Sequence, residues 1–264
     1  MIPGLPDTYT LRARIIPALI AAIPVFVLAT LLVPWDRFSL SQALSSLSVA
    51  ILLFALSDLA RRHGKRIEPK LYTRSGGKPT VTMLRHRDRA LDDITKSKIV
   101  SFLAGKLGEK EPSTAEELAN PIAADAFYER CGTWLRENTR DQKRFAILFN
   151  DNVTYGYRRN LLGLKSIALA LNTLVLTTTA IILWLRLEDG FADDLNSKML
   201  SVGVIAGLHS VYLLLGVTEA SVAEASKTYA RQLLLSCISL GENGTPMGKL
   251  PSQSTKRPTA SRNK

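Results

Sequence analysis

The sequence predicts an all-α integral membrane protein, in which four transmembrane helices form two hairpins and a mostly helical cytoplasmic domain lies between the hairpins. Residues 15–35, 38–57, 166–185 and 199–218 each contain at least 20 consecutive positions without a charged side chain. A helix of about 20 apolar residues spans the ~30 Å hydrocarbon core of a bilayer. Four such segments exclude an ordinary soluble enzyme, a secreted disulfide scaffold and a disordered protein.

The first hairpin is predicted over residues 15–59, after a short cytoplasmic N-terminus at residues 1–14. Arg12 and Arg14 precede its first apolar run, which is also the pattern of a cleaved signal peptide. The run is longer than the apolar region of most signal peptides, and no small-x-small cleavage site follows it. We therefore expect a retained transmembrane helix.

The positions of Lys and Arg predict the orientation, because basic residues are retained on the cytoplasmic side of a membrane. The densest basic cluster, which includes Arg61, Arg62, Lys65 and Arg66, directly follows the second apolar segment. The connection between the third and fourth segments is acidic instead. Both termini and the middle segment should therefore face the cytoplasm, in a multi-pass protein of the cell (inner) membrane.

The cytoplasmic domain is predicted over residues 60–163 and should contain three helices. Apolar residues recur at helical spacing over residues 88–107, with Asp88 as the N-cap. Asn120 followed by Pro121 predicts the start of a second helix, and a third should begin near Asp141. We expect the apolar stripes of these helices to form the core of the domain.

Two shorter features complete the predicted domain. Ser113 and Glu116 have the spacing of a capping box, which predicts a short turn of helix between the first two helices. Residues 71–84 should form a loop with a short extended piece, because Gly76 and Gly77 interrupt the pattern and Val81 alternates with threonine.

The sequence around Lys78 is a candidate anion-binding loop. Two glycines precede Lys78, but Tyr72 occupies the position of the first glycine of a phosphate-binding loop, and Pro79 replaces its metal-binding hydroxyl. The pattern therefore does not match a P-loop. A looser anion site formed by Lys78 with Arg85, His86 and Arg87 remains one interpretation, and an ordinary basic surface turn is the other.

Residues 155–160, which we call the joint, directly precede the third apolar segment and contain Tyr155, Tyr157, Arg158 and Arg159. Tyrosine and arginine at a membrane boundary commonly anchor a helix in the headgroup layer. They also have the chemistry to bind a nucleotide, by stacking on a base and pairing with phosphate. The third interpretation, which we prefer to the nucleotide site, is a joint through which the cytoplasmic domain acts on the membrane helix.

The second hairpin is predicted over residues 164–218 and contains polar side chains at membrane depth. His209 lies near the centre of its span, and Thr177 and Thr178 should lie at a similar depth on the preceding helix. We expect an interhelical hydrogen bond from His209 to a threonine, with a water-filled path as the alternative. Gly203 and Gly207 have the spacing that allows close helix packing.

Beyond the membrane, residues 219–241 should form a cytoplasmic stalk helix that ends at Gly241. The third span should likewise extend into the cytoplasm as a helix, and the two extensions should pack antiparallel. Residues 242–264 are rich in Ser, Thr, Pro and Lys and should be a disordered basic tail.

No catalytic motif, metal-ligand pattern or cofactor motif is recognisable, so we expect neither an enzyme nor a bound metal or cofactor. Cys131 and Cys237 both fall on the reducing side, which argues against a disulfide. Nucleic acid is not an expected partner, because no binding motif accompanies the basic residues. The expected partners are the lipid bilayer, further copies of the chain and a nucleotide or protein signal.

In outline, this architecture resembles the four-span effectors of bacterial defence systems, and the resemblance covers the whole chain loosely. It implies a membrane signalling or effector protein, whose cytoplasmic domain senses a ligand or partner and acts through the membrane helices, including by pore formation. The alternative functions are an accessory subunit of a transporter or channel and, third, a membrane enzyme.

Overall fold

The computed structural model describes residues 7–32, 42–189 and 193–241, and every regular element in these ranges is helical. The elements in chain order are α1 (Thr8–Thr10), the π-helical turn η1 (Leu11–Ile15), α2 (Ile16–Leu32), α3 (Gln42–Arg74), α4 (Pro79–Thr82), α5 (Asp93–Leu107), α6 (Thr114–Ala119), α7 (Pro121–Asn138), α8 (Ala146–Leu185), the 3₁₀ turn η3 (Leu187–Asp189), α9 (Asp194–Gly216) and α10 (Glu219–Gly241). The predicted all-α class is confirmed for this part of the chain.

Three helical segments are long and apolar enough to cross a membrane: Thr8–Leu32, Ala146–Leu185 and Asp194–Gly216. The second predicted span, at residues 38–57, begins outside the described residues and continues into α3. Within α3, the side chains of Ile51, Leu52 and Phe54 are exposed, as lipid-facing residues would be. The four-span layout therefore stays a prediction beyond these three helices.

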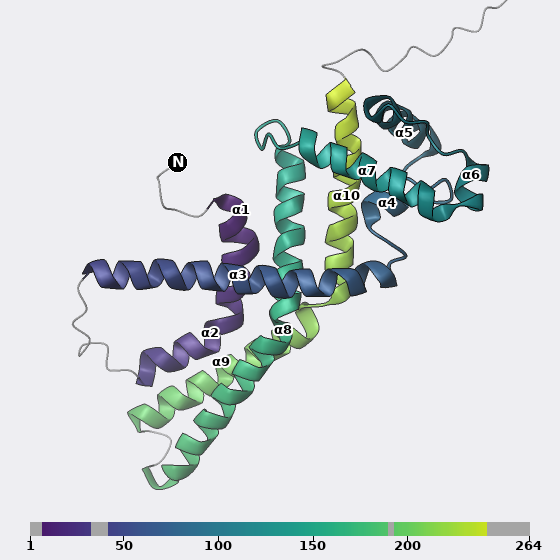
Figure 1. Cartoon of the computed structure of the whole chain (residues 1–264). Coiled ribbons are helices and arrows are strands. Elements are labelled where there is room, and N and C mark those ends of the chain that lie inside the picture. Colours follow the sequence, from purple (N-terminus) through teal and green to yellow (C-terminus); the bar gives the residue numbers. More distant parts are fainter. Residues whose placement is uncertain (1–6, 33–41, 190–192, 242–264) are drawn as a thin grey trace, which may run out of the picture.

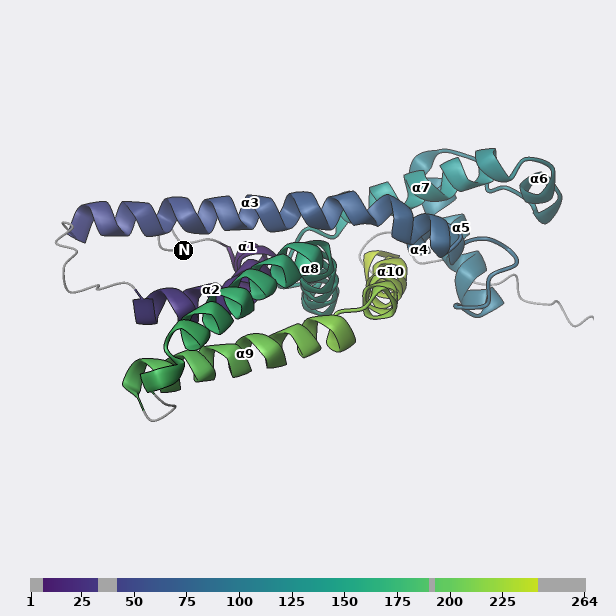
Figure 2. The same ribbon diagram turned by 90° about the horizontal axis from the view of Figure 1, so that it is seen from below.

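The central element is α8, which packs against α2, α3, α9 and α10. Figure 2 shows α8 between α3 on one side and α9 on the other. In Figure 1, α3 crosses α8 and extends to both sides of it. The predicted first hairpin pairs the helices on either side of residues 33–41, but α2 packs mainly against α8 and only marginally against α3. The small side chains of Ala18 and Ala21 allow this approach, since they are buried in one cluster with Leu164 and Ala168 of α8.

The helical domain, formed by α4 to α7, the start of α8 and the second half of α10, has a core of its own. The core includes Leu84, Leu103, Cys131 and Leu135, all fully buried. The start of the first predicted helix was wrong. Asp88 accepts a bond from Ala90 N–H in a turn, and Asp92 caps α5 by accepting from Thr95 N–H at 2.8 Å.

The other predicted caps of the domain are confirmed. The side chain of Asn120 accepts a bond from Ala123 N–H at the start of α7, with Pro121 in the first turn. Ser113 and Glu116 form a reciprocal capping box at α6. Both caps depend on residues three apart, so the chain can satisfy them without any tertiary contact.

The segment before α5 differs from the prediction. Residues 71–84 contain no extended piece: α3 continues to Arg74, and Pro79 begins the short helix α4. Gly76 and Gly77 do form the predicted interruption, with φ angles of +75° and +134° that favour glycine. The alternation of Val81 with threonine was misleading, because Val81 is buried by a helical turn in the core of the domain.

The third predicted helix begins five residues later than Asp141, at Ala146, because Asp141 accepts bonds from Lys143 N–H and Arg144 N–H in a turn. From there α8 continues for 40 residues, which confirms that the third span extends as a helix. The predicted domain boundary at 163 and 164 falls inside this helix, and the boundary at 59 and 60 falls inside α3.

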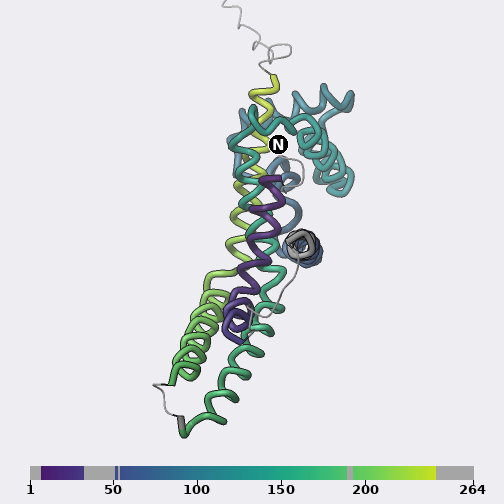
Figure 3. The backbone as a smooth tube through the Cα atoms, turned by 90° about the vertical axis from the view of Figure 1, so that its left-hand side faces the viewer, coloured from purple at the N-terminus to yellow at the C-terminus, as the bar shows by residue number. Residues whose placement is uncertain are grey.

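The predicted stalk is present as two antiparallel helices. Figure 3 shows α10 beside the first half of α8, and α9 beside the second half. However, α10 does not continue α9: α9 ends at Gly216, Val217 has extended backbone angles, and Thr218 accepts a bond from Ser221 N–H. The described part of α10 extends to Gly241, and the residues beyond the predicted helix end lie outside the described ranges. The predicted disordered tail, at 242–264, lies outside the described residues.

Candidate functional site

Two glycines allow α3 and α8 to touch where they cross. A Cβ atom on Gly163 would lie 2.6 Å from the backbone nitrogen of Gly64, and one on Gly64 would lie 2.0 Å from Asn160 Oδ1. Any larger side chain would push the two backbones apart. The crossing therefore fixes which residues of α3 face the joint.

The joint contains a buried polar network between these two helices. The Arg159 guanidinium, 9% exposed, donates to Glu68 Oε1 of α3 at 2.6 Å. The hydroxyl of Tyr155 donates to the same oxygen at 2.8 Å, and it lies 2.9 Å from the hydroxyl of Tyr72. The Arg159 guanidinium also lies over the Tyr155 ring, 5.4 Å from its centre. Removal of one charged partner would leave the other buried and unpaired.

The network extends to the N-terminal segment through Asn160. Its side-chain oxygen accepts from Arg159, and its amide nitrogen donates to the backbone oxygen of Ala13 at 2.5 Å. Ala13 belongs to η1, whose π-helical turn places its chain against Gly156: a Cβ atom on Gly156 would lie 3.0 Å from Ala13 Cβ. The joint thus connects η1 to α3 and α8.

On its other side, the joint holds α10 and α9. Arg158 donates to the backbone oxygen of Ser221 at 3.0 Å and lies 3.4 Å from a carboxylate oxygen of Glu224. The rings of Tyr155 and Tyr229 stack in parallel, with centroids 6.2 Å apart. Tyr157 packs against the apolar cluster that contains Leu213 of α9.

One turn beyond the joint, Lys165 of α8 donates to the backbone oxygens of Leu214 at 3.2 Å and Val217 at 2.9 Å. These carbonyls lie at the end of α9, where an intrahelical partner is missing and a cation is favourable. The transition from α9 to α10 is therefore also attached to α8.

These contacts favour the interpretation of residues 155–160 as a joint. The side chains of Tyr155 and Arg159 are buried and paired within the protein, and Arg158 is directed at α10. Tyr155 and Arg159 are therefore not free to line an open nucleotide site of the kind considered from the sequence.

The candidate anion loop is not assembled in the structure. Lys78 pairs with Glu129 at 2.7 Å, and Arg85 makes a two-bond pair with Asp125 at 2.8 and 2.6 Å. The hydrogen bonds to Asp125 raise the pKa of Arg85. Arg87 and His86 line a separate pocket together with Arg89 and Glu111. Carboxylates of α7 thus neutralise the two cations nearest the glycine turn.

Within the membrane segments, the partner of His209 is Asn172 rather than a threonine. Asn172, 1% exposed, lies 3.1 Å from His209 Nδ1 and donates to Ser210 Oγ at 2.8 Å. Thr177 is exposed and Thr178 is half-buried. The signal for Asn172 in the sequence is that it is the one amide side chain in residues 166–185.

Two buried polar atoms near this cluster, His209 Nε2 and Thr179 Oγ1, have no hydrogen-bond partner among the described residues. Only one glycine of the predicted pair, Gly203, lies in contact with the neighbouring helix. A Cβ atom on Gly203 would meet Thr179 Cγ2 at 3.5 Å, whereas one on Gly207 would meet nothing within 4 Å. Gly203 therefore packs against α8, and Gly207 does not serve close packing within one chain.

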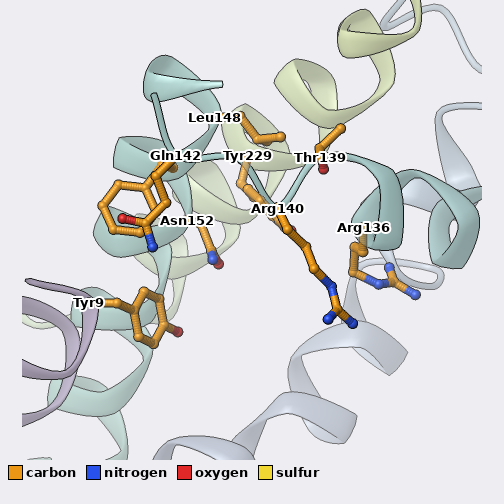
Figure 4. A pocket seen from close by; sticks show the side chains of 9 residues that line it. Tyr9, Arg136, Thr139, Arg140, Gln142, Leu148, Asn152 and Tyr229 are labelled. Carbon is orange, nitrogen blue, oxygen red and sulfur yellow. The ribbon is translucent and has the colours of Figure 1, made fainter. Parts of the chain in front are cut away.

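A pocket of about 430 Å³ lies next to the joint, and no sequence pattern predicted it. Figure 4 shows the side chains that line it. They are Tyr9 of α1, Arg136 of α7, Thr139, Arg140 and Gln142 of the following connection, Leu148, Phe149 and Asn152 of α8, and Tyr229 of α10.

No protein family, no curated protein and no solved structure matches this chain.

Proposed function

We propose that this chain is a membrane-embedded signalling or effector protein, whose helical domain senses a ligand or partner and acts on the membrane helices through the joint. The single observation that carries the proposal is the continuity of α8. One helix of 40 residues contributes Leu148 to the core of the helical domain, Arg159 to the joint and Val175 to the contact with α9. A displacement of one end of such a helix is transmitted to its other end.

Such a protein requires an element that can adopt two arrangements, and in this proposal the joint is that element. A signal shifts an equilibrium only when it binds one arrangement better than the other. In the arrangement described here, Glu68, Tyr72, Tyr155 and Arg159 hold α3 to α8, and Arg158 holds α10. Movement of α10 would break the stacking of Tyr229 on Tyr155 and release the network from one side.

In this proposal the protein lies in the inner membrane of the cell. The helical domain and both termini then face the cytoplasm. The basic residues at positions 61–66 support this orientation, as basic residues are retained on that side. They also favour contact with anionic lipids, at about 1 kcal/mol for each residue near the surface.

The second candidate function is an ion-conducting assembly of several copies. The observation that favours it is the Asn172–His209 pair, in which Nε2 of the histidine has no partner among the described residues. Polar groups inside a membrane typically mark an ion or proton path. One copy is too small to enclose a wide pore, so conduction would require oligomers.

The proposal is tested by measuring whether the joint holds the two halves of the molecule together. Spin labels at the exposed positions Lys98 of α5 and Ser201 of α9 report the distance between the helical domain and the far end of α9. In lipid nanodiscs, the wild-type protein should give one narrow distance distribution. Arg159→Ala should broaden or shift it, because it removes the ion pair with Glu68 that joins α8 to α3.

The control variant is Arg89→Gln, which removes an exposed pair with Asp93 elsewhere in the helical domain. It should leave the distribution unchanged. An unchanged distribution in Arg159→Ala, in a protein with wild-type helix content, would contradict the role of the joint.

A further inference from the structure

The pocket beside the joint has one cationic side. In the view of Figure 4, the guanidinium groups of Arg136 and Arg140 extend along one side of the pocket, and Tyr9 lies across from them. The nine lining residues include no carboxylate. Among the lining side chains, an anion that enters the pocket would therefore meet two positive charges and no negative charge.

Both arginines are partly exposed, and their ion pairs within the protein are weak. Arg136 donates to Thr133 Oγ1 at 2.8 Å and lies 3.4 Å from Glu129, whose carboxylate is already bound by Lys78 at 2.7 Å. Arg140 pairs with Glu137 on the surface, where the guanidinium is 73% exposed. Exposed ion pairs of this kind contribute little. A phosphate group, which accepts two parallel bonds from a guanidinium, competes with them effectively.

The remaining walls are aromatic and amide side chains. Tyr9, Phe149 and Tyr229 supply ring surfaces from three different helices, and Asn152 and Gln142 each supply both a donor and an acceptor. Aromatic side chains bind nucleobases by stacking, and amides pair with the polar edges of a base. The volume of about 430 Å³ falls within the range of small-molecule sites, which is roughly 300 to 1,000 Å³.

We propose that this pocket binds a nucleotide, with its phosphate groups on Arg136 and Arg140 and its base among Tyr9, Phe149 and Tyr229. The combination of two guanidinium groups, three rings and two amides in one concave site carries this assignment. A plain anion would use only the arginines, and an apolar ligand would leave both arginines unused.

The position of the pocket gives such a ligand access to the joint. Tyr229 lines the pocket and also stacks on Tyr155, and a Cβ atom on Gly156 would lie 2.9 Å from the hydroxyl of Tyr9. A nucleotide in the pocket therefore contacts two residues that themselves contact the joint. This regulatory consequence rests on the proposed function, whereas binding of the nucleotide does not.

The test is calorimetric titration of the purified full-length protein in nanodiscs with ATP, ADP, AMP, GTP, adenosine and inorganic phosphate. We expect at least one nucleotide to bind at least tenfold more tightly than adenosine and than phosphate, because only a nucleotide uses both sides of the pocket. Arg140→Gln and Tyr229→Leu should each weaken that binding about tenfold or more. Arg89→Gln, which removes a similar exposed pair at the other pocket, should leave it unchanged.

Three results would overturn the assignment. They are the absence of binding by every nucleotide at millimolar concentration, equal binding of phosphate and nucleotides, and equal binding by the wild-type protein and by Arg140→Gln and Tyr229→Leu proteins that unfold at the wild-type temperature. The spin-label measurement separates this inference from the proposed function. Nucleotide binding that does not change the Lys98–Ser201 distance would support the nucleotide site but contradict its coupling to the joint. A changed distance in Arg159→Ala, in a protein that binds no nucleotide, would support the role of the joint but contradict the nucleotide site.

Discussion

Gly64 of α3 and Gly163 of α8 are in backbone contact where the two helices cross, and neither position has room for a side chain. A Cβ atom on Gly163 would lie 2.6 Å from Gly64 N and 2.6 Å from His63 C. The three atoms nearest to that Cβ all belong to the backbone of α3, so no flexible group could move away. This contact sets the spacing at which Glu68 reaches Arg159.

Gly163→Ala should therefore disrupt the crossing, although alanine is the better helix former. Overpacking costs typically about 1–3 kcal/mol, and a clash with backbone belongs at the upper end of that range. The matched control is Gly105→Ala in α5, where a Cβ atom would meet nothing within 4 Å and the helix should gain up to about 1 kcal/mol. Thermal unfolding in detergent measures both, and a neutral Gly163→Ala would contradict the packing described here.

The buried ion pair of the joint predicts a strongly non-additive double-mutant cycle. Glu68→Ala should destabilise the protein by about 3–5 kcal/mol, because it leaves the buried Arg159 guanidinium without its partner. Arg159→Ala should cost less, because Glu68 is 22% exposed and keeps its hydrogen bond from Tyr155. The double variant should lose much less than the sum, since no buried charge remains. Additive losses in denaturant unfolding would mean that the two side chains act independently.

The predicted topology can be tested with single cysteines. Gly190→Cys should react with an impermeant maleimide from outside intact cells, and Ser252→Cys should react only after lysis. The native Cys131 and Cys237 are both buried and should contribute no background. Labelling at position 252 in intact cells would reverse the orientation that the basic residues predict.

Alkaline pH should destabilise the helical domain through the same two thiols. Burial raises the pKa of Cys131 and of Cys237 to about 12, from an ordinary value of 9.0. Below pH ~9 the two thiols stay protonated in both the folded and the unfolded protein. As the pH rises further, only the unfolded protein loses the thiol protons. The free energy of unfolding should therefore fall from about pH 9 towards pH 12. Urea titrations of a variant with Cys131→Ala and Cys237→Ala should show a shallower fall, and an identical slope would contradict this.

The polar cluster in the membrane separates the two candidate functions. If the protein conducts ions, Asn172→Leu and His209→Leu should each abolish depolarisation of cells in which the wild-type protein causes it. Thr177→Val, at an exposed position of the same helix, should have no effect. Potential-sensitive dye fluorescence measures this. A wild-type protein that produces its phenotype at unchanged potential would leave the signalling function alone.

Several elements could be predicted from the sequence because short-range interactions determine them. The capping box of Ser113 and Glu116 and the cap at Asn120 need only residues three apart. The apolar length of three membrane segments is a property of composition alone. The start at Asp88 was wrong for a related reason: Asp92 offers an equivalent cap one turn later, and packing of the core selects between them.

Tertiary structure alone decided the site. Glu68 and Arg159 are 91 positions apart, so no local pattern indicates that they pair. Lys78 and Arg85 are cations of the kind that an anion-binding loop contains. Only the packing of α7 brings the carboxylates of Glu129 and Asp125 next to them, where they neutralise both charges. The sequence determined which segments are helical and apolar, because backbone hydrogen bonds and transfer into lipid act locally. The pocket and the joint form where helices that are distant in the chain cross. Their side chains are complementary in shape and charge only once the tertiary structure brings them together.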